Sequence, residues 1–181
     1  MLDLNFYIDM VSMRKTLCNS LVQCHFDYSS SSWFCGLTKQ LKNRLQVTQN
    51  KVVRFIHGVS CRTSLSVKDF KELGMLDVEN RCRQNRLNHA HKIFNGGCPK
   101  YLRENFVKTS DVHNYNDKNN FFVPHANGFT LNTFYYNCIK DWNQLPENIK
   151  CVKSKYKFKR LVKTHLLEKM MLTENSDYIW F

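Results

Sequence analysis

The sequence predicts an all-α fold, an irregular multi-helix assembly in two small lobes with at most a short extended segment near residues 121–123. Apolar residues recur at steps of three and four along most of the chain, which is the period of helices with one buried face. Polar and glycine-containing breaks separate these stretches. Hydrophobic residues make up 43% of the 181, which is enough to build a core.

The N-terminal half is predicted to hold the most regular helices. Short polar side chains at 27–32 end a first helix over 8–24, because they compete for backbone hydrogen bonds. The strongest pattern covers 37–57 and ends at His57-Gly58, since glycine readily adopts the left-handed cap conformation. The stripe expected on the first helix consists of Met10, Met13, Leu17, Leu21 and Cys24.

Two further helices follow from their capping residues. Ser66 with Asp69 resembles a capping box and predicts a short helix that ends at Gly74. Asp77 is a suitable N-cap for a helix from residue 78 to about residue 94. The run 95–99 contains two glycines and a proline, which should end that helix.

The C-terminal half is predicted to begin after a polar loop. Residues 108–120 are almost wholly polar, so we expect an exposed loop that separates a region over 1–107 from one over 121–181. Thr133 should cap a helix that Pro146 closes, and a last helix should run over about 154–172. Trp142 and Phe158 stand at core spacings on these two helices.

Charge composition points to a polyanionic partner. The 27 Lys and Arg residues against 15 Asp and Glu give a formal charge of +12, which attracts nucleic acid because each neutralised phosphate releases counterions. A merely basic soluble protein is the alternative. No stretch approaches the roughly 20 apolar residues that span a bilayer, so we expect no membrane partner.

The N-terminus and the cysteines predict the compartment. Residues 1–13 carry two aspartates and no early lysine or arginine, which is a poor signal peptide. The eight cysteines are scattered without a Cys-x-x-Cys pair, so we expect free thiols. We therefore expect an intracellular protein, in the nucleus or the cytoplasm, that is not secreted.

Two basic helices carry the predicted nucleic-acid contacts. Contacts of this kind go to phosphates and position a protein without reading sequence. The C-terminal run also interleaves aromatic residues with cations, as expected for a groove that both neutralises and stacks. A solvated helix face, or a nuclear localisation signal in the C-terminal run, would use the same residues. The predicted contact residues are Lys39, Lys42, Arg44, Lys51, Arg54, Lys153, Lys155, Lys157, Lys159, Arg160 and Lys163.

The sequence predicts no catalytic residue, metal site or cofactor. Two-metal nucleotidyl transfer needs converging carboxylates, and no Asp-Asp pair occurs. His89 and His91 are two residues apart, so on a helix they point about 200° apart, which suits zinc poorly. No Gly-x-Ser-x-Gly context supports a nucleophilic serine.

Short segments stand in a fixed order along nearly the whole chain. They are 21–28 (LVQCHFDY), 45–51 (LQVTQNK), 54–58 (RFIHG), 72–76 (ELGML), 92–96 (KIFNG), 113–116 (HNYN) and 142–146 (WNQLP). In this order they resemble the region downstream of the polymerase core in non-LTR (LINE-type, jockey-like) retrotransposon reverse transcriptases. Any one segment is common, and the ordered set is what makes the resemblance specific. The chain departs from the family pattern at Ser29, where a cysteine is frequent, and at Asp117-Lys118, where Thr-Arg is frequent.

The resemblance implies a non-catalytic part of an RNA-directed DNA polymerase. That family copies RNA into DNA with palm-domain aspartates that hold Mg²⁺, and this chain begins past their motif. Residues 1–107 would correspond to a thumb-like region and 121–181 to a C-terminal basic region, which grip the template–primer duplex. The polymerase core would be a partner, and any Mg²⁺ would belong to the absent palm. Two alternatives stay open: a non-functional remnant of a decayed element, and a helical interaction module that docks on a missing polymerase core.

Overall fold

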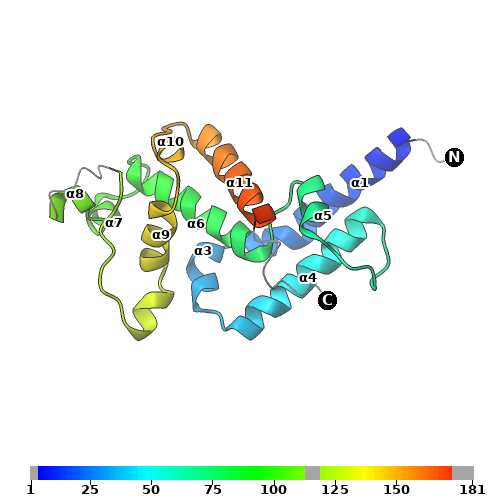
Figure 1. Ribbon diagram of the computed structural model, residues 1–181, viewed down its shortest axis with the longest axis horizontal. Helices are drawn as coiled ribbons and strands as arrows, with labels where there is room; N and C mark the ends of the chain where they lie inside the picture. Colours follow the sequence, from blue (N-terminus) through cyan, green and yellow to red (C-terminus); the bar gives the residue numbers. More distant parts are fainter. Residues whose placement is uncertain (1–3, 113–118, 173–181) are drawn as a thin grey trace. The chain divides into compact units, whose positions relative to one another are not determined.

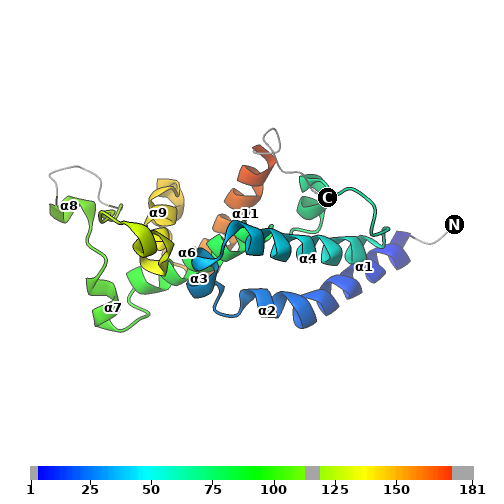
Figure 2. The same ribbon diagram turned by 90° about the horizontal axis from the view of Figure 1, so that it is seen from below.

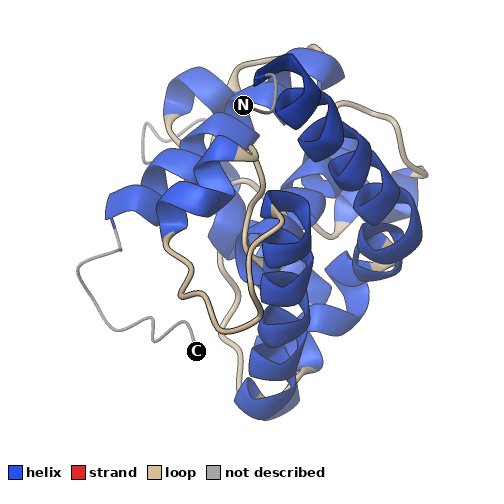
Figure 3. Cartoon of the chain, turned by 90° about the vertical axis from the view of Figure 1, so that its right-hand side faces the viewer, coloured by secondary structure: helices blue, strands red, loops and turns tan. Residues whose placement is uncertain are grey.

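The computed structural model describes residues 4–112 and 119–172, and its regular structure is helical (Figure 1). No strand forms within these ranges (Figure 3). An isolated antiparallel bridge joins Lys108 to Phe121, which is all that the described residues retain of the extended segment predicted near 121–123. The predicted all-α class is confirmed. The resemblance segment 113–116 and the departure at 117–118 lie outside the described residues.

The chain forms two compact units. Unit 1 contains Met1–Tyr28, Thr38–Arg81 and Leu167–Phe181, and unit 2 contains Ser29–Leu37 and Cys82–Leu166. The loop predicted at 108–120 as a lobe boundary lies within unit 2, and Thr109–Val112 forms the single turn α8. Asn143 explains this placement, because its amide exchanges two hydrogen bonds with the backbone of Phe121 and so ties the end of the loop to α9.

Unit 1 begins with one long helical run that packs along α4 (Figures 1 and 2). The run consists of α1 (Leu4–Cys18), a π-helical turn (Asn19–Gln23) and α2 (Cys24–Asp27). The helix predicted over 8–24 is confirmed, but its stripe is not buried, because Leu17 and Leu21 are exposed and Cys18 and Gln23 face inward. The inward-facing residues Cys18 and Gln23 are five positions apart, which is the spacing of the π-helical turn and not that of an α-helical stripe.

The helix α4 (Lys39–His57) ends where its sequence predicts and begins two residues later than predicted. Thr38 caps it, with the side-chain oxygen accepting a hydrogen bond from the Leu41 backbone N–H. Gly58 ends it at φ 69°, and a Cβ there would clash with the Arg14 guanidinium. Val53 and Ile56 on its inner face are fully buried, so α4 forms the main wall of the unit 1 core.

The next two helices start at the predicted caps. Ser66 and Asp69 form the capping box of α5 (Val67–Glu72), with the Ser66 backbone N–H donating to Asp69 Oδ2 over 2.6 Å. Asp77 accepts from the Asn80 backbone N–H over 2.7 Å and caps α6 (Val78–Phe94). Arg81 on the first turns of α6 forms a bidentate ion pair with Asp27, which anchors α2 in unit 1.

Unit 2 is built around the second part of α6 and an aromatic cluster. Trp142 and Phe158 are both buried in it, as predicted, with ring centroids 5.8 Å apart. Asp141 accepts from Arg86 over 2.7 Å and from Arg83 over 2.9 Å. The remaining elements of this unit are α3 (Ser30–Trp33), α7 (Lys100–Glu104), α8, α9 (Phe134–Asn143), α10 (Glu147–Lys150), most of α11 (Lys155–Leu172) and the 3₁₀ turns Phe34–Gly36 and Gly128–Asn132.

Candidate nucleic-acid interface

The helix α11 carries exposed cations beside a buried stripe. Phe158, Val162 and Leu166 are buried at steps of four, so this side of the helix is fixed in the unit 2 core. Every predicted contact residue from 153 to 163 is exposed. Lys155, Lys159 and Lys163 form one row at i, i+4 and i+8, where successive residues rise by about 6 Å.

Packing beneath this surface holds α11 in place. The Phe158 ring stacks on the His91 ring with centroids 4.2 Å apart, and His91 Nε2 lies 2.7 Å from the Val152 carbonyl oxygen. The Lys159 carbonyl accepts a hydrogen bond from Gln84 Nε2 over 3.2 Å, which ties α11 to α6. The cations therefore project from a helix whose register is set by the core, rather than from a loop.

The electrostatic surroundings of α11 favour an anion. No aspartate or glutamate occurs between Glu147 and Glu168. Glu147 is engaged with Lys150 over 2.8 Å, and its pKa is lowered by hydrogen bonds from Lys150 and Asn119. Partial burial lowers the pKa of His89, and Lys92 and Lys155 lower it further. Along the sequence, the acidic residues nearest to this run therefore stand at its two ends.

Tyr156 is an exposed aromatic side chain beside the cationic row. It is 78% exposed and lies between Lys155 and Lys157 in the sequence. A ring in this position can stack on a base while neighbouring lysines contact phosphates. Phe158, the other aromatic residue of this run, is in the core, so only Tyr156 of the two can act in this way.

The predicted contacts on α4 lie in unit 1, and they do not all share one exposed face. Arg44 and Lys51 are exposed seven residues apart, Lys39 is exposed in the first turn and Lys42 is half-buried. Arg54 corrects the prediction, because it is 8% exposed and its Nε donates to the Thr63 carbonyl over 2.8 Å. This guanidinium holds the segment after α4 instead of facing solvent. Sequence spacing missed this because the partner is a loop carbonyl.

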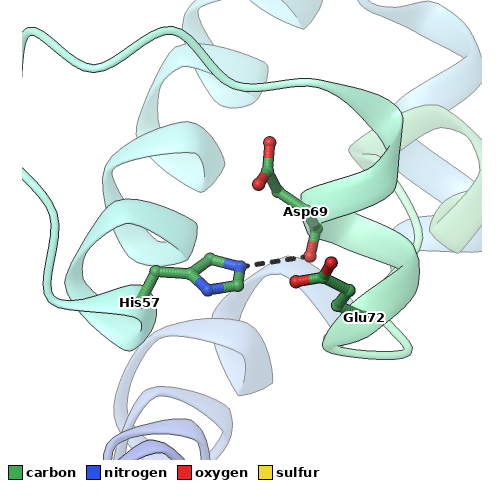
Figure 4. Close-up of side chains that lie close together, drawn as sticks. All are labelled: His57, Asp69 and Glu72. Atoms are coloured by element: carbon green, nitrogen blue, oxygen red, sulfur yellow. Dashed lines mark hydrogen bonds between the residues drawn. The ribbon is translucent and has the colours of Figure 1, made fainter.

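Two side-chain groupings were not predicted from the sequence. In unit 2, Ser31 Oγ lies 2.9 Å from His89 Nδ1 in a hollow of about 300 Å³ that Lys92 also lines. In unit 1, a possible ligand atom from each of His57, Asp69 and Glu72 lies within 4.8 Å of the others (Figure 4). Both groupings join residues from different elements, so no spacing motif marks them.

The grouping around His57 is held by backbone contacts. One imidazole and two carboxylates are ligands that divalent metals accept. However, His57 Nε2 lies 3.2 Å from the Asp69 carbonyl oxygen, and Asp69 Oδ2 accepts from both Ser66 N and Ser66 Oγ. Figure 4 shows the Asp69 carboxylate pointing away from the imidazole, whereas the Glu72 carboxylate lies on the same side as the imidazole. We interpret these contacts as the joint between α4 and α5.

Comparisons with known proteins give no relative. The sequence matches no protein-family model and no curated protein, and no solved structure matches the chain. Among the described residues, no helix combines the length and the apolar character needed to cross a membrane. What can be said of function therefore depends on the surfaces described above.

Proposed function

We propose that this chain binds the sugar–phosphate backbone of RNA or DNA without sequence preference, through the exposed cations of α11. The observation that carries the proposal is the row Lys155, Lys159 and Lys163 on a helix fixed in the core, with Arg160 beside it and no acidic residue between Glu147 and Glu168. Charge at fixed spacing suits a regular polyanion, because phosphates repeat along a strand. Lys153 and Lys157 extend the surface, and Lys39, Lys42, Arg44 and Lys51 of unit 1 would add contacts.

The ordered sequence segments that resemble LINE-type reverse transcriptases suggest the protein in which this binding would act. In that setting, the chain is a non-catalytic C-terminal fragment of a LINE-type retrotransposon RNA-directed DNA polymerase, acting in the nucleus or the cytoplasm. It would support the template–primer duplex and need no cofactor of its own, and synthesis would require the palm aspartates and Mg²⁺ of a polymerase core. A primer-extension assay on this chain should therefore show no incorporation of dNTPs.

Salt dependence tests the phosphate contacts. Affinity for a short duplex should fall steeply between about 50 and about 200 mM salt, with a logarithmic slope of about 0.9 for each phosphate contact. Lys155→Gln/Lys159→Gln/Lys163→Gln removes three contacts and should make the slope shallower by about 2.7. The loss of affinity over that salt range should then be about 40-fold smaller than for the wild-type chain.

A matched variant separates local contacts from net charge. Lys68→Gln/Lys71→Gln/Lys108→Gln removes the same charge from exposed lysines elsewhere, and it should leave the slope within about 0.5 of wild type. Equal slopes for the two triple variants would refute contact through α11, since long-range charge would then explain the binding. A wild-type affinity independent of salt would refute phosphate contacts altogether.

A further inference from the structure

The two long helices of unit 1 enclose an exposed apolar groove. Its walls are Leu17, Cys18, Leu21 and Val22 of the first helical run and Thr48, Lys51, Val52 and Phe55 of α4, and its volume is about 330 Å³. Leu17 is 49% exposed, Leu21 62% and Phe55 51%. Large apolar side chains gathered in this way, rather than scattered singly, mark an interaction surface.

The shape of the groove fits a helix. It lies between two packed helices. A groove of this form accepts a third helix, whose side chains pack between the side-chain ridges of the other two. Thr48 to Phe55 extends over about 10 Å of α4, which matches apolar anchors at i, i+4 and i+7 of an occupant. Addition of a strand would need a free sheet edge, and the described residues form no sheet.

The positive charge around the groove indicates that the bound helix has acidic residues on its flanks. No acidic residue occurs between Asp9 and Asp27 or between Asp27 and Asp69, so both walls lack acids. Lys51 lines the groove, and the Arg14 guanidinium lies 5.8 Å from the centre of the Phe55 ring. Nucleic acid does not suit the floor, because a phosphate placed on leucine and valine side chains would lose hydration without a partner.

We propose that this groove docks an amphipathic α-helix with acidic residues on both sides of its apolar face. Leucine-sized anchors would fill the space between Leu21 and Phe55, and carboxylates would meet Lys51 and Arg14 at the rim. The proposal does not depend on the α11 surface, since the groove belongs to unit 1 and the α11 cations to unit 2, and Lys51 is the residue that both proposals name. Its failure would leave the proposed function of α11 untouched.

A labelled peptide of known sequence tests the proposal on the full chain. The probe is a fluorescein-labelled helix of about 18 residues with leucine at i, i+4, i+7 and i+11, glutamate on both flanks and alanine elsewhere. Fluorescence anisotropy should show binding with a Kd below about 100 μM. The same peptide with lysine in place of glutamate should bind at least about 10-fold more weakly.

Groove variants locate the binding. Leu21→Glu and Phe55→Glu change exposed residues, so the fold should persist, and each should weaken binding of the acidic peptide by at least about 10-fold. Phe129→Glu, at a phenylalanine that is 94% exposed in unit 2, should change nothing. Lys51→Glu should weaken the acidic peptide and strengthen the lysine-flanked one. Lys155→Gln/Lys159→Gln/Lys163→Gln should bind the acidic peptide like wild type.

Several results would overturn the proposal. Absence of binding up to about 100 μM would do so, as would equal binding by wild type and Phe55→Glu. Sedimentation of the chain alone tests whether a second copy of the chain occupies the groove. A dimer that Phe55→Glu dissolves would assign the groove to self-association and contradict the acidic helix.

Discussion

Replacing Asp77 by asparagine should stabilise the protein at neutral pH. Asp77 is 7% exposed, and burial raises its pKa from 3.8 to about 6, with a smaller contribution from Glu79. Each pH unit between two pKa values is worth about 1.4 kcal/mol. Near pH 7 the ionised side chain therefore costs about 3 kcal/mol of folding free energy, as an upper estimate. Asparagine avoids this cost and still accepts the hydrogen bond from the Asn80 backbone N–H.

The pH dependence has a definite sign. Because the pKa of Asp77 is raised in the folded state, its favourable contribution is complete below about pH 4 and is lost as pH rises through about 6. The stabilisation by Asp77→Asn should thus grow from less than about 1 kcal/mol near pH 4 to about 3 kcal/mol near pH 7. Urea unfolding at these pH values measures it.

The helix dipole opposes the effect of burial on Asp77, and the balance of the two is what the measurement tests. A carboxylate at the N-terminus of a helix is favoured by the helix dipole, typically by about 0.3–1 kcal/mol and up to about 2 kcal/mol. Desolvation should exceed this at Asp77, because the side chain is buried. If Asp77→Asn were destabilising near pH 7, the dipole and the cap would outweigh burial. Asp111→Asn, at an exposed position, is the control and should change unfolding by less than about 0.5 kcal/mol.

Three further substitutions, with Tyr156→Ala as a control, test buried contacts within the two units. Phe158→Ala should cost about 3–5 kcal/mol of unfolding free energy in urea, whereas Tyr156→Ala should stay within about 0.5 kcal/mol; similar costs would place Phe158 outside the core. Asp141→Asn should destabilise by about 3–5 kcal/mol, because Arg86 would remain buried without its carboxylate; a neutral effect would mean that water replaces the carboxylate. Arg54→Ala should destabilise the protein by about 1–3 kcal/mol and leave the salt slope of nucleic-acid binding unchanged. A change in that slope would show that Arg54 contacts the nucleic acid.

Local signals in the sequence predicted most helix ends. The Ser66–Asp69 box and Asp77 mark helix starts, and Gly58 and Gly74 follow helix ends with positive φ. These signals act within a few residues, so they can be read without a tertiary structure. Core positions at regular helical spacing, such as Trp142 and Phe158, were predictable for the same reason.

Tertiary placement of polar residues was not predictable in this way. Arg54 and Gln49 are buried because a loop carbonyl and the Leu76 carbonyl accept their hydrogen bonds. Gln23 is fully buried within the π-helical turn, and neither of its amide atoms has a hydrogen-bond partner among the described residues. The stripe through Leu17 and Leu21 has the spacing of a core face but lines an open groove. Periodicity shows which residues share a face of a helix, and it does not show what covers that face.

Chemical footprinting of lysines would test the binding surface most directly. The full chain is acetylated with and without a saturating short duplex, and the modified lysines are quantified by mass spectrometry. Lys155, Lys159 and Lys163 should lose most of their reactivity when the duplex is bound, whereas Lys68 and Lys71 should keep theirs. Equal reactivity of the three α11 lysines in both samples, under conditions where the duplex is bound, would contradict the assignment of the interface to α11.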